Sequence, residues 1–457
     1  MEERDAVVIG GGIAGLAAAW RLRERDALLL EAGDRLGGRL RSDPRGAYWM
    51  NYGAHLFPGP GSLVDSLARA CGLDTVPVTG GMMGMAVGSA RLTHGRVETY
   101  PFRLPLSLRE RAAFAVAGVR LQRAVARYRR ATAARPGDSP ADVRARALAF
   151  EDHRTFGEFL GPLPPAVEAI FSCAAHRATA ELTELSAGCG IGLFALVWSG
   201  RGSLIARNLL GGTGALPAAL GDRLGARART GCRVRALRPE GDAIVVEHDT
   251  GAICARQVIV AVPAPQAAPL VAPAAEHAAA ALERITYGAF LSVAVETDER
   301  GPMPWDDVYA IATPGRAFDL FTNQAQALRD GGPRKPGGSL MLFAGAHAAA
   351  ELAREPDAVI VARFLDDLHA LYPASRGIVA DAVVHRWELG NVFARPGRHR
   401  LQAPLEGALG PHRNLHLAGD YFAELGNMEA AARTGDLAAQ RVDAHLRSHP
   451  TTEVQRA

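Results

Sequence analysis

Short apolar runs separated by glycine and polar residues form the start of the chain. Ala6–Ile9 is an apolar run of the kind that forms a parallel strand buried on both faces. From Ile13 to Arg25 apolar residues recur at helical spacing, and a second apolar run follows at Ala27–Leu30. The order strand, helix, strand indicates a βαβ unit, which predicts a parallel sheet and an α/β fold.

The rest of the chain alternates between helical and strand-like stretches. Residues 105–160 are rich in Ala and Arg at helical spacing, with a break at Arg135–Pro140. Beyond Gly231, turn signals separate short apolar runs. We therefore expect strands at Val234–Leu237, Ala243–Glu247, Gln257–Val262, Tyr287–Glu296 and Asn414–Ala418, a surface loop at Asp330–Gly338, and a helix from about Met428 to His445.

The composition narrows the class of protein. At 457 residues, 48% of them hydrophobic and 22% charged, the chain is long enough for two or three folded domains. A net charge of +3 gives no reason to expect nucleic acid as a partner. The five cysteines contain no CxxC pair, so neither a zinc ribbon nor a disulfide framework is indicated. Since the apolar start is too short to span a membrane and lacks a signal-peptide layout, we expect a cytoplasmic protein without a metal site.

Three glycines between the first strand and the first helix fit a dinucleotide-binding turn. Gly10, Gly12 and Gly15 have GxGxxG spacing, and the motif gains weight from its place between a strand and a helix. Gly10 allows the tight turn, Gly12 lets the backbone approach a pyrophosphate, and Gly15 lets the helix pack closely on the strand. Glu31 ends the second strand about 20 residues further on, the spacing needed to reach a ribose hydroxyl.

The nine residues Glu31–Arg39, EAGDRLGGR, resemble the ExxxRxGGR motif of the flavin amine oxidase superfamily. This superfamily includes protoporphyrinogen oxidases and phytoene-type desaturases. The resemblance implies FAD as the cofactor, with Ala14, Arg35 and Gly38 among the residues that bind it. Arg39 offers a forked donor to phosphate or flavin oxygens.

Two later stretches resemble further FAD segments of the same superfamily. Gly211-Gly212, followed by Val234 and Val258–Pro263, resembles its second segment, in which the residue matching Val234 binds adenine through its backbone. Leu417–Asp420 with Gly426–Gly435 resembles its C-terminal segment.

In that C-terminal segment, the residue matching Asp420, after Gly419, contacts the ribityl chain of the cofactor. The helix N-terminus near Met428 is implied to face the flavin pyrimidine oxygen. The order of the three segments implies two interleaved domains. We expect residues 1–80, 201–286 and 400–457 to form a Rossmann-like FAD-binding domain, and residues 81–200 and 287–399 to form a discontinuous, mixed α+β substrate domain.

The groups that define amine oxidases within this superfamily are missing. Those enzymes carry a lysine near flavin N5, on a strand that matches Gly288–Ser292, where this chain has no lysine. The only lysine, Lys335, falls in the predicted surface loop, where we expect it to be solvated. One position of the aromatic pair that orients the amine is Asn427, and the other is approximated by Trp387 or Phe393. A simple amine oxidase is therefore disfavoured.

His55 is the candidate catalytic residue. It lies in Tyr52–Phe57, which matches a loop that runs beside the isoalloxazine in this superfamily. A histidine there bonds the flavin, acts as acid or base, or is a hydrogen-bonded structural residue, and the sequence leaves these open. The same stretch resembles the YGPHIF loop of UDP-galactopyranose mutases, so a non-redox isomerase or mutase is an alternative.

Other residues offer weaker candidates for substrate contact. Met82, Met83 and Met85, with Tyr100 and Phe102, fit an apolar pocket or equally a packed core. The polar candidates for a substrate pocket are His176 and Arg177.

Residues 109–130 carry seven arginines and an apolar stripe, formed by Phe114, Leu121, Val125 and Tyr128. This pattern fits peripheral contact with an anionic membrane or, as we favour, packing against the helix's own domain.

The expected activity follows from these observations. We expect an FAD-dependent oxidase or dehydrogenase, desaturase-like, that oxidises a largely apolar small molecule by hydride transfer to flavin N5, with specialised metabolism as a plausible setting. Because a second GxGxxG is missing, oxygen or another acceptor is favoured over a pyridine nucleotide for reoxidation. The alternatives are the mutase, an amine oxidase with an atypical site, and a flavoprotein without enzymatic activity. The oligomeric state stays open.

Overall fold

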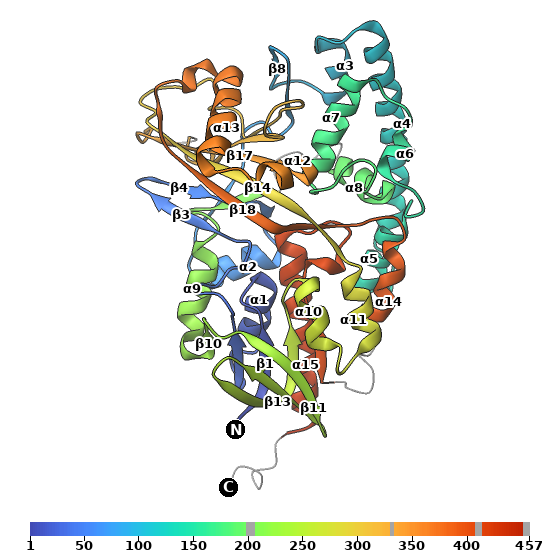
Figure 1. Cartoon of the computed structure of the whole chain (residues 1–457), viewed down its shortest axis with the longest axis vertical. Coiled ribbons are helices and arrows are strands. Elements are labelled where there is room, and N and C mark those ends of the chain that lie inside the picture. Colours follow the sequence, from blue (N-terminus) through green and yellow to red (C-terminus); the bar gives the residue numbers. More distant parts are fainter. Residues whose placement is uncertain (198–205, 330–332, 407–413, 451–457) are drawn as a thin grey trace.

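A sheet assembled from three distant stretches of the chain forms one end of the molecule (Figure 1). The computed structural model describes residues 1–197, 206–329, 333–406 and 414–450. Within these residues the sheet has seven strands, in the order β10, β2, β1, β13, β12, β11, with β19 pairing on β13. Their bounds are β1 Glu2–Ile9, β2 Ala27–Leu30, β10 Ala228–Arg229, β11 Val234–Glu240, β12 Ala243–His248, β13 Gly251–Val260 and β19 Leu415–Leu417.

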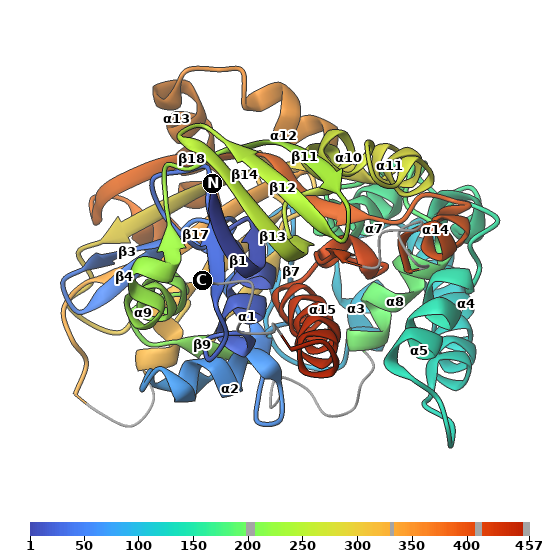
Figure 2. The same ribbon diagram turned by 90° about the horizontal axis from the view of Figure 1, so that it is seen from below.

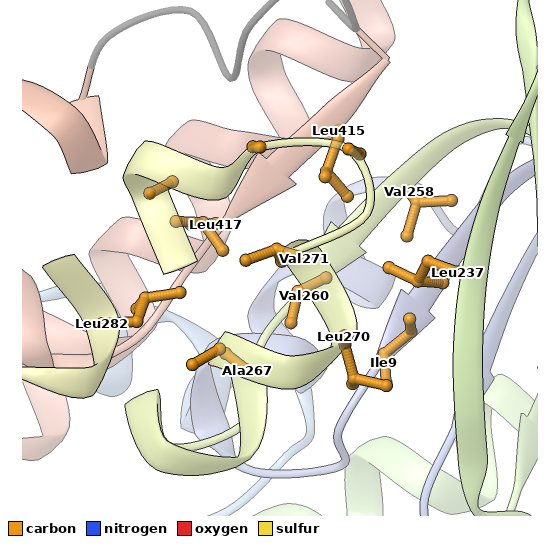
Figure 3. Close-up of a cluster of buried hydrophobic side chains, with 14 of the residues drawn as sticks. Ile9, Leu237, Val258, Val260, Ala267, Leu270, Val271, Leu282, Leu415 and Leu417 are labelled. Atoms are coloured by element: carbon orange, nitrogen blue, oxygen red, sulfur yellow. The ribbon is translucent and has the colours of Figure 1, made fainter. Parts of the chain in front are cut away.

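The middle of this sheet is parallel and buried on both faces. β1 pairs in parallel with β2 and β13, and β13 pairs in parallel with β19. Val7 and Ile9 of β1 face α10 (Ala264–Val271) and α11 (Glu276–Glu283), in the core shown in Figure 3. Ala6 and Val8 face the opposite core, with α1 (Ile13–Arg21) and α15 (Met428–Ser448). Figure 2 shows these helix pairs on the two sides of the sheet. The predicted α/β fold is confirmed.

A second, mostly antiparallel sheet lies beside the first (Figure 1). Its strand order is β18, β14, β17, β16, β15, β7, β8. The helices α12 (Ala346–Leu352) and α13 (Asp357–Leu371) pack on it. Its strands are β7 Gly84–Val87, β8 Ala90–Leu92, β14 Thr286–Thr297, β15 Ala310–Ala312, β16 Leu320–Asn323, β17 Gly338–Gly345 and β18 Val379–Phe393.

A group of helices covers a third side of the molecule, around the long helix α4 (Leu108–Thr132). A capping box between Ser107 and Glu110 begins α4. Leu121 and Val125 are buried against neighbouring helices, so the apolar stripe packs on them. The membrane contact considered for it stays a prediction. The neighbouring helices are α5 Pro140–Ala149, α6 Phe156–Leu160, α7 Pro165–His176 and α8 Ala187–Val197.

Small elements connect these parts. They are β3 Ser42–Arg45, β4 Tyr48–Asn51, β5 Phe57–Pro58, β6 Thr75–Pro77, β9 Ala206–Leu209, α2 Leu63–Ala70, α3 Tyr100–Arg103, α9 Ala215–Leu224 and α14 Gln402–Glu406.

The predicted elements agree with the structure except at some of their ends. The first helix ends at Arg21 instead of Arg25, because residues 22–25 turn back, with Arg25 N–H donating to the carbonyl of Leu22, so that β2 can begin at Ala27. The strand predicted at Gln257–Val262 is the second half of β13 and ends at Val260. The predicted loop at Asp330–Gly338 lies partly outside the described residues, and Gly338 already belongs to β17. The domain boundaries stay a prediction.

None of the helices in the described part of the chain combines the length and the apolar character that crossing a membrane requires. In the same residues, His, Cys, Asp and Glu side chains form no group of three that could hold a metal ion.

Candidate cofactor and substrate site

The glycine turn between β1 and α1 has an open side at Gly12. Gly10 has φ of +104°, which favours glycine, and a Cβ on Gly15 would lie 1.8 Å from the Gly10 carbonyl oxygen. A Cβ on Gly12, in contrast, would meet nothing within 4 Å. Gly12 is also the N-cap of α1, and no side chain caps the helix there. The turn therefore fits a phosphate group at the N-terminus of the helix.

Glu31 lies at the end of β2, beside this turn. Its two carboxylate oxygens accept hydrogen bonds from the N–H groups of Gly11 (2.6 Å) and Gly33 (2.7 Å). Each oxygen keeps a lone pair for a further donor such as a ribose hydroxyl. Cys232 N–H donates to the Glu31 carbonyl at 2.8 Å, which brings the start of β11, and so Val234, alongside.

The loop after Glu31 closes over the glycine turn. Gly37 N–H donates to the Gly11 carbonyl at 2.8 Å, and a Cβ on Gly38 would lie 3.4 Å from the Gly12 Cα. The guanidinium of Arg35 donates to three carbonyls of this loop, those of Leu36, Gly38 and Leu40. Arg35 therefore shapes the loop that faces Gly12.

Arg39 joins the first FAD segment to the last. Its guanidinium forms a bidentate ion pair with Asp420, with N–O distances of 2.7 and 2.9 Å. The Asp420 side chain is 5% exposed and that of Arg39 is 28% exposed. Just before Asp420, Gly419 N–H donates to the Thr434 hydroxyl on α15 at 2.9 Å. The pair brings together two residues that are far apart in the sequence, both implied to contact FAD.

Helix α15 packs tightly on α1 at this site. A Cβ on Gly435 would lie 1.9 Å from the carbonyl oxygen of Ala14, so glycine is required for this contact. Met428, the first residue of α15, is 3% exposed. Asn427 caps the helix by accepting from Ala430 N–H at 2.8 Å. The cofactor contacts expected for Ala14 and Met428 stay predictions.

His55 lies in the loop that packs on the backbone of Arg39. Ala54 N–H donates to the Arg39 carbonyl at 3.2 Å. His55 Nδ1 is 2.9 Å from the Gly53 carbonyl, so Nδ1 carries the proton and Nε2 is an acceptor. Burial lowers the pKa of His55, and the charge of Arg177 lowers it further. His55 is therefore neutral at pH 7.

Apolar side chains from five segments of the chain lie near His55. Partly buried Leu56, Met82 and Phe290 pack around buried Tyr309 and Phe343. The Tyr309 ring lies 6.2 Å from that of His55, and the rings of Phe290 and Phe343 lie 4.7 Å apart. We call these five residues the apolar wall.

The methionine stretch is divided between two clusters. Met82 joins the apolar wall, whereas Met85 packs with Tyr100 in a separate core. The Met83 carbonyl accepts from the Tyr100 hydroxyl at 2.8 Å, and Phe102 is 65% exposed. Of this stretch, only Met82 lies in the apolar wall beside His55.

The strand matched to the amine oxidase lysine has no room for a long side chain at its start. A Cβ on Gly288 would lie 1.9 Å from the Thr179 carbonyl oxygen, because the turn after α7 packs directly against it. Further along, Ser292 donates to the Tyr52 carbonyl at 2.7 Å. Lys335 is exposed, as expected.

Trp387 and Phe393, the two candidates for the second aromatic of the amine-orienting pair, lie in different parts of the structure. Trp387 donates from Nε1 to the Tyr52 carbonyl at 2.7 Å, and Gly53 packs against its ring, beside the His55 loop. Phe393 is 2% exposed and packs in the core formed by the helices around α4, not against the loop that carries His55.

His176 is held by two carboxylates. Its Nδ1 lies 2.7 Å from Asp319 and its Nε2 lies 3.1 Å from Glu181. Burial alone would lower the pKa of His176, but these two hydrogen bonds outweigh it and raise the pKa to about 10. His176 is therefore a charged structural residue at neutral pH.

This raised pKa predicts a loss of stability in alkali. A histidine that titrates at a higher pH in the folded state stabilises fully below its unfolded pKa, near 6.5, and stops doing so as the pH rises through about 10. We expect the difference in free energy of unfolding between wild type and His176→Gln to be largest near pH 6 and to shrink toward pH 10, measured by denaturant titration. An equal difference across this range would contradict the assignment.

Several residues of the site have no signal in the sequence. Tyr287 places its ring 5.7 Å from the Arg39 guanidinium, and Tyr309 accepts from Asn208 Nδ2 at 3.2 Å. Thr179 adopts φ of +61° at the turn after α7. Each depends on contacts between distant segments, which no local motif marks.

The glycine turn, the Glu31 carboxylate beside it and the pairing of Arg39 with Asp420 are the arrangement expected of a Rossmann-like FAD-dependent oxidoreductase. The model of the flavin-containing amine oxidoreductase family matches residues 13–443. The chain belongs to this family of flavin-containing oxidoreductases.

Curated relatives match short stretches only. Amine oxidase [flavin-containing] A of Canis lupus familiaris is 38% identical over 103 residues, which is 22% of this chain and 18% of the relative. Coproporphyrinogen III oxidase of Mycobacterium leprae (strain TN) is 45% identical over 62 residues, 12% of this chain and 14% of the relative. The chain thus aligns with less than a fifth of the length of either relative.

Solved structures match nearly the whole chain. Cyclohexylamine oxidase from Brevibacterium oxydans IH-35A has a TM-score of 0.76 at 19% identity, covering 97% of this chain and 99% of that one. A wild-type putrescine oxidase bound to putrescine has a TM-score of 0.74 at 19% identity, with the same coverage. At this identity the likeness shows the fold alone.

Proposed function

We propose that this oxidase acts on a largely apolar small molecule, oxidising or desaturating it at a C–H or C–N centre beside the flavin. The observation that carries this proposal is the apolar wall next to His55, which adjoins the Arg39 loop. Bound FAD would supply the redox chemistry by accepting a hydride from the substrate carbon and passing the electrons to oxygen or another acceptor. The wall would bury the substrate body and exclude water.

The charges near the wall argue against a protonated amine as the preferred substrate. Arg177 is the cation close enough to influence His55. The nearby carboxylates of Asp319 and Asp420 are already paired, with His176 and Arg39. Among the described residues, a cationic amine would meet the like charge of Arg177, while the carboxylates of Asp319 and Asp420 are already taken.

His55 is our candidate for a proton acceptor or a hydrogen-bond partner of the substrate. It is neutral, and its Nε2 is free of the bond that Nδ1 makes to Gly53. A neutral imidazole can take a proton as a C–H or N–H bond is oxidised. Its position beside the Arg39 loop supports this role.

Anaerobic mixing of FAD-loaded protein with polyenes, porphyrinogens and amines tests the proposed function. We expect a largely apolar class, the polyenes or the porphyrinogens, to bleach the flavin and protonated amines to do so far more slowly. If amines are the only class that reduces the flavin, the proposed preference for a largely apolar substrate is wrong.

The same mixing experiment distinguishes an oxidase from a non-redox isomerase. An isomerase would form product only after dithionite reduces the flavin, and would consume no acceptor. We expect the opposite: substrate turnover by the oxidised protein, with stoichiometric consumption of the acceptor.

A further inference from the structure

Arg177 carries an exposed guanidinium on the turn that follows α7. It follows the last residue of α7 and is exposed, whereas Ala175, Ala178 and Thr179 around it are buried. Burial nevertheless lowers the pKa of Arg177. Among the described residues it has no hydrogen-bond or ion-pair partner, unlike Arg35 and Arg39.

The turn that carries Arg177 is pressed between two strands of the second sheet. A Cβ on Gly345, at the end of β17, would lie 2.0 Å from the His176 carbonyl oxygen. Likewise, a Cβ on Gly288 of β14 would lie 1.9 Å from the Thr179 carbonyl oxygen. Figure 1 shows the end of α7 beside α12 and β14. Gly345 is the register partner of Phe290, so the turn that carries Arg177 lies at the edge of the apolar wall.

This turn is held in one conformation by several independent contacts. Thr179 and Ala346 have φ of +61° and +62°, and they are two of the three non-glycine residues with positive φ in the described chain. Backbone strain of this kind persists only where the surroundings enforce it, and it gathers at binding sites. The paired His176 anchors the same turn through Asp319, which also accepts from Gly345 N–H at 2.9 Å.

We propose that Arg177 binds a carboxylate carried by the substrate, so that the substrate is an amphiphilic acid with its apolar body on the apolar wall. This inference rests on the proposed function for the identity of the reacting centre. The planar fork of a guanidinium matches a carboxylate in a bidentate arrangement. A phosphate dianion would leave one charge unbalanced, because His55 beside it is neutral.

The arrangement makes Arg177 a specificity-determining residue. A guanidinium without a partner can form a charge-assisted interaction with a carboxylate ligand, and a neutral analogue lacks that interaction. The fixed turn adds preorganisation, since little side-chain or backbone ordering remains to be done on binding.

The test compares benzoate with benzamide, its uncharged counterpart of the same shape, on FAD-loaded protein. Binding is followed by the change in flavin absorbance and by calorimetry. We expect wild type to bind benzoate at least about tenfold more tightly than benzamide. Arg177→Gln should abolish that preference, and Arg177→Lys should keep part of it because a lysine supplies charge without the fork.

The control variant is Arg363→Gln, which removes an exposed arginine on α13 and should keep the wild-type preference. The FAD content and thermal unfolding of Arg177→Gln should equal those of wild type. Equal binding of the two probes by wild type, no binding of either, or a preference for benzoate that survives in Arg177→Gln would overturn the proposal.

The outcomes also separate this inference from the proposed function. If wild type prefers benzoate through Arg177 but no apolar substrate bleaches the flavin, the proposed function fails and the carboxylate site remains. If neutral apolar substrates bleach the flavin and wild type shows no preference for benzoate, only the carboxylate site fails. Comparing each acid substrate with its methyl ester gives a second readout, since Arg177→Gln should raise KM for the acid and leave the ester unchanged.

Discussion

Gly12→Ala should leave the stability of the apoprotein unchanged and weaken FAD binding by about tenfold or more. Gly12 has φ of −68°, which any residue adopts, and an added Cβ meets nothing within 4 Å. The same Cβ would occupy the space at the N-terminus of α1 that the turn leaves for a phosphate. Titration of apoprotein with FAD, followed by flavin fluorescence, measures the loss, and urea unfolding measures the stability.

Gly15→Ala is the matched control, three residues away in the same turn. Its Cβ would lie 1.8 Å from the Gly10 carbonyl oxygen, so we expect a loss of about 1–3 kcal/mol in unfolding free energy even without cofactor. The two variants should thus lose FAD for different reasons. Normal FAD affinity in Gly12→Ala would show that the pyrophosphate does not approach this turn.

Replacing Arg39 by glutamine should destabilise the protein by about 3 kcal/mol as well as weaken FAD binding. The substitution leaves the Asp420 carboxylate, which is 5% exposed, without its bidentate partner. Asp420→Asn should have a smaller effect, because the Arg39 guanidinium is partly exposed and water can solvate it. Denaturant unfolding of the two single variants and the double variant measures the coupling.

The double variant should recover part of the stability that Arg39→Gln loses, since no buried charge is then unpaired. The exposed pair Arg235–Asp249, with an N–O distance of 2.6 Å, is the control, and breaking it should change the stability far less. If the stability losses of the two single variants add up to the loss of the double variant, the side chains of Arg39 and Asp420 do not act as a pair.

The start of the fold could be predicted from sequence because its signals are local. Residue type and spacing alone predict the apolar runs Ala6–Ile9 and Ala27–Leu30 as strands and the glycines between them as a turn. In the structure these are β1, β2 and the turn that follows β1. The end of α1 could not be placed, because the spacing continues to Arg25 while the chain must turn back at Leu22 to enter β2.

The reacting side of the site could be predicted only in part. The absence of a lysine at Gly288–Ser292 is visible in the sequence. That Gly288 leaves no room for a side chain depends on Thr179, which is distant in sequence. The sequence also offered His176 and Arg177 as equal candidates. The structure separates them, because Asp319 and Glu181 hold His176 while Arg177 has no partner among the described residues.

The most direct test of the account is whether substrate oxidation and flavin reduction are one event. FAD-loaded protein is mixed without oxygen with a substrate found by the screen, carrying either hydrogen or deuterium at the carbon that is oxidised. We expect the flavin to be bleached in step with product formation, and more slowly with deuterium. Product formed while the flavin stays oxidised, or formed only after dithionite treatment, would contradict the account.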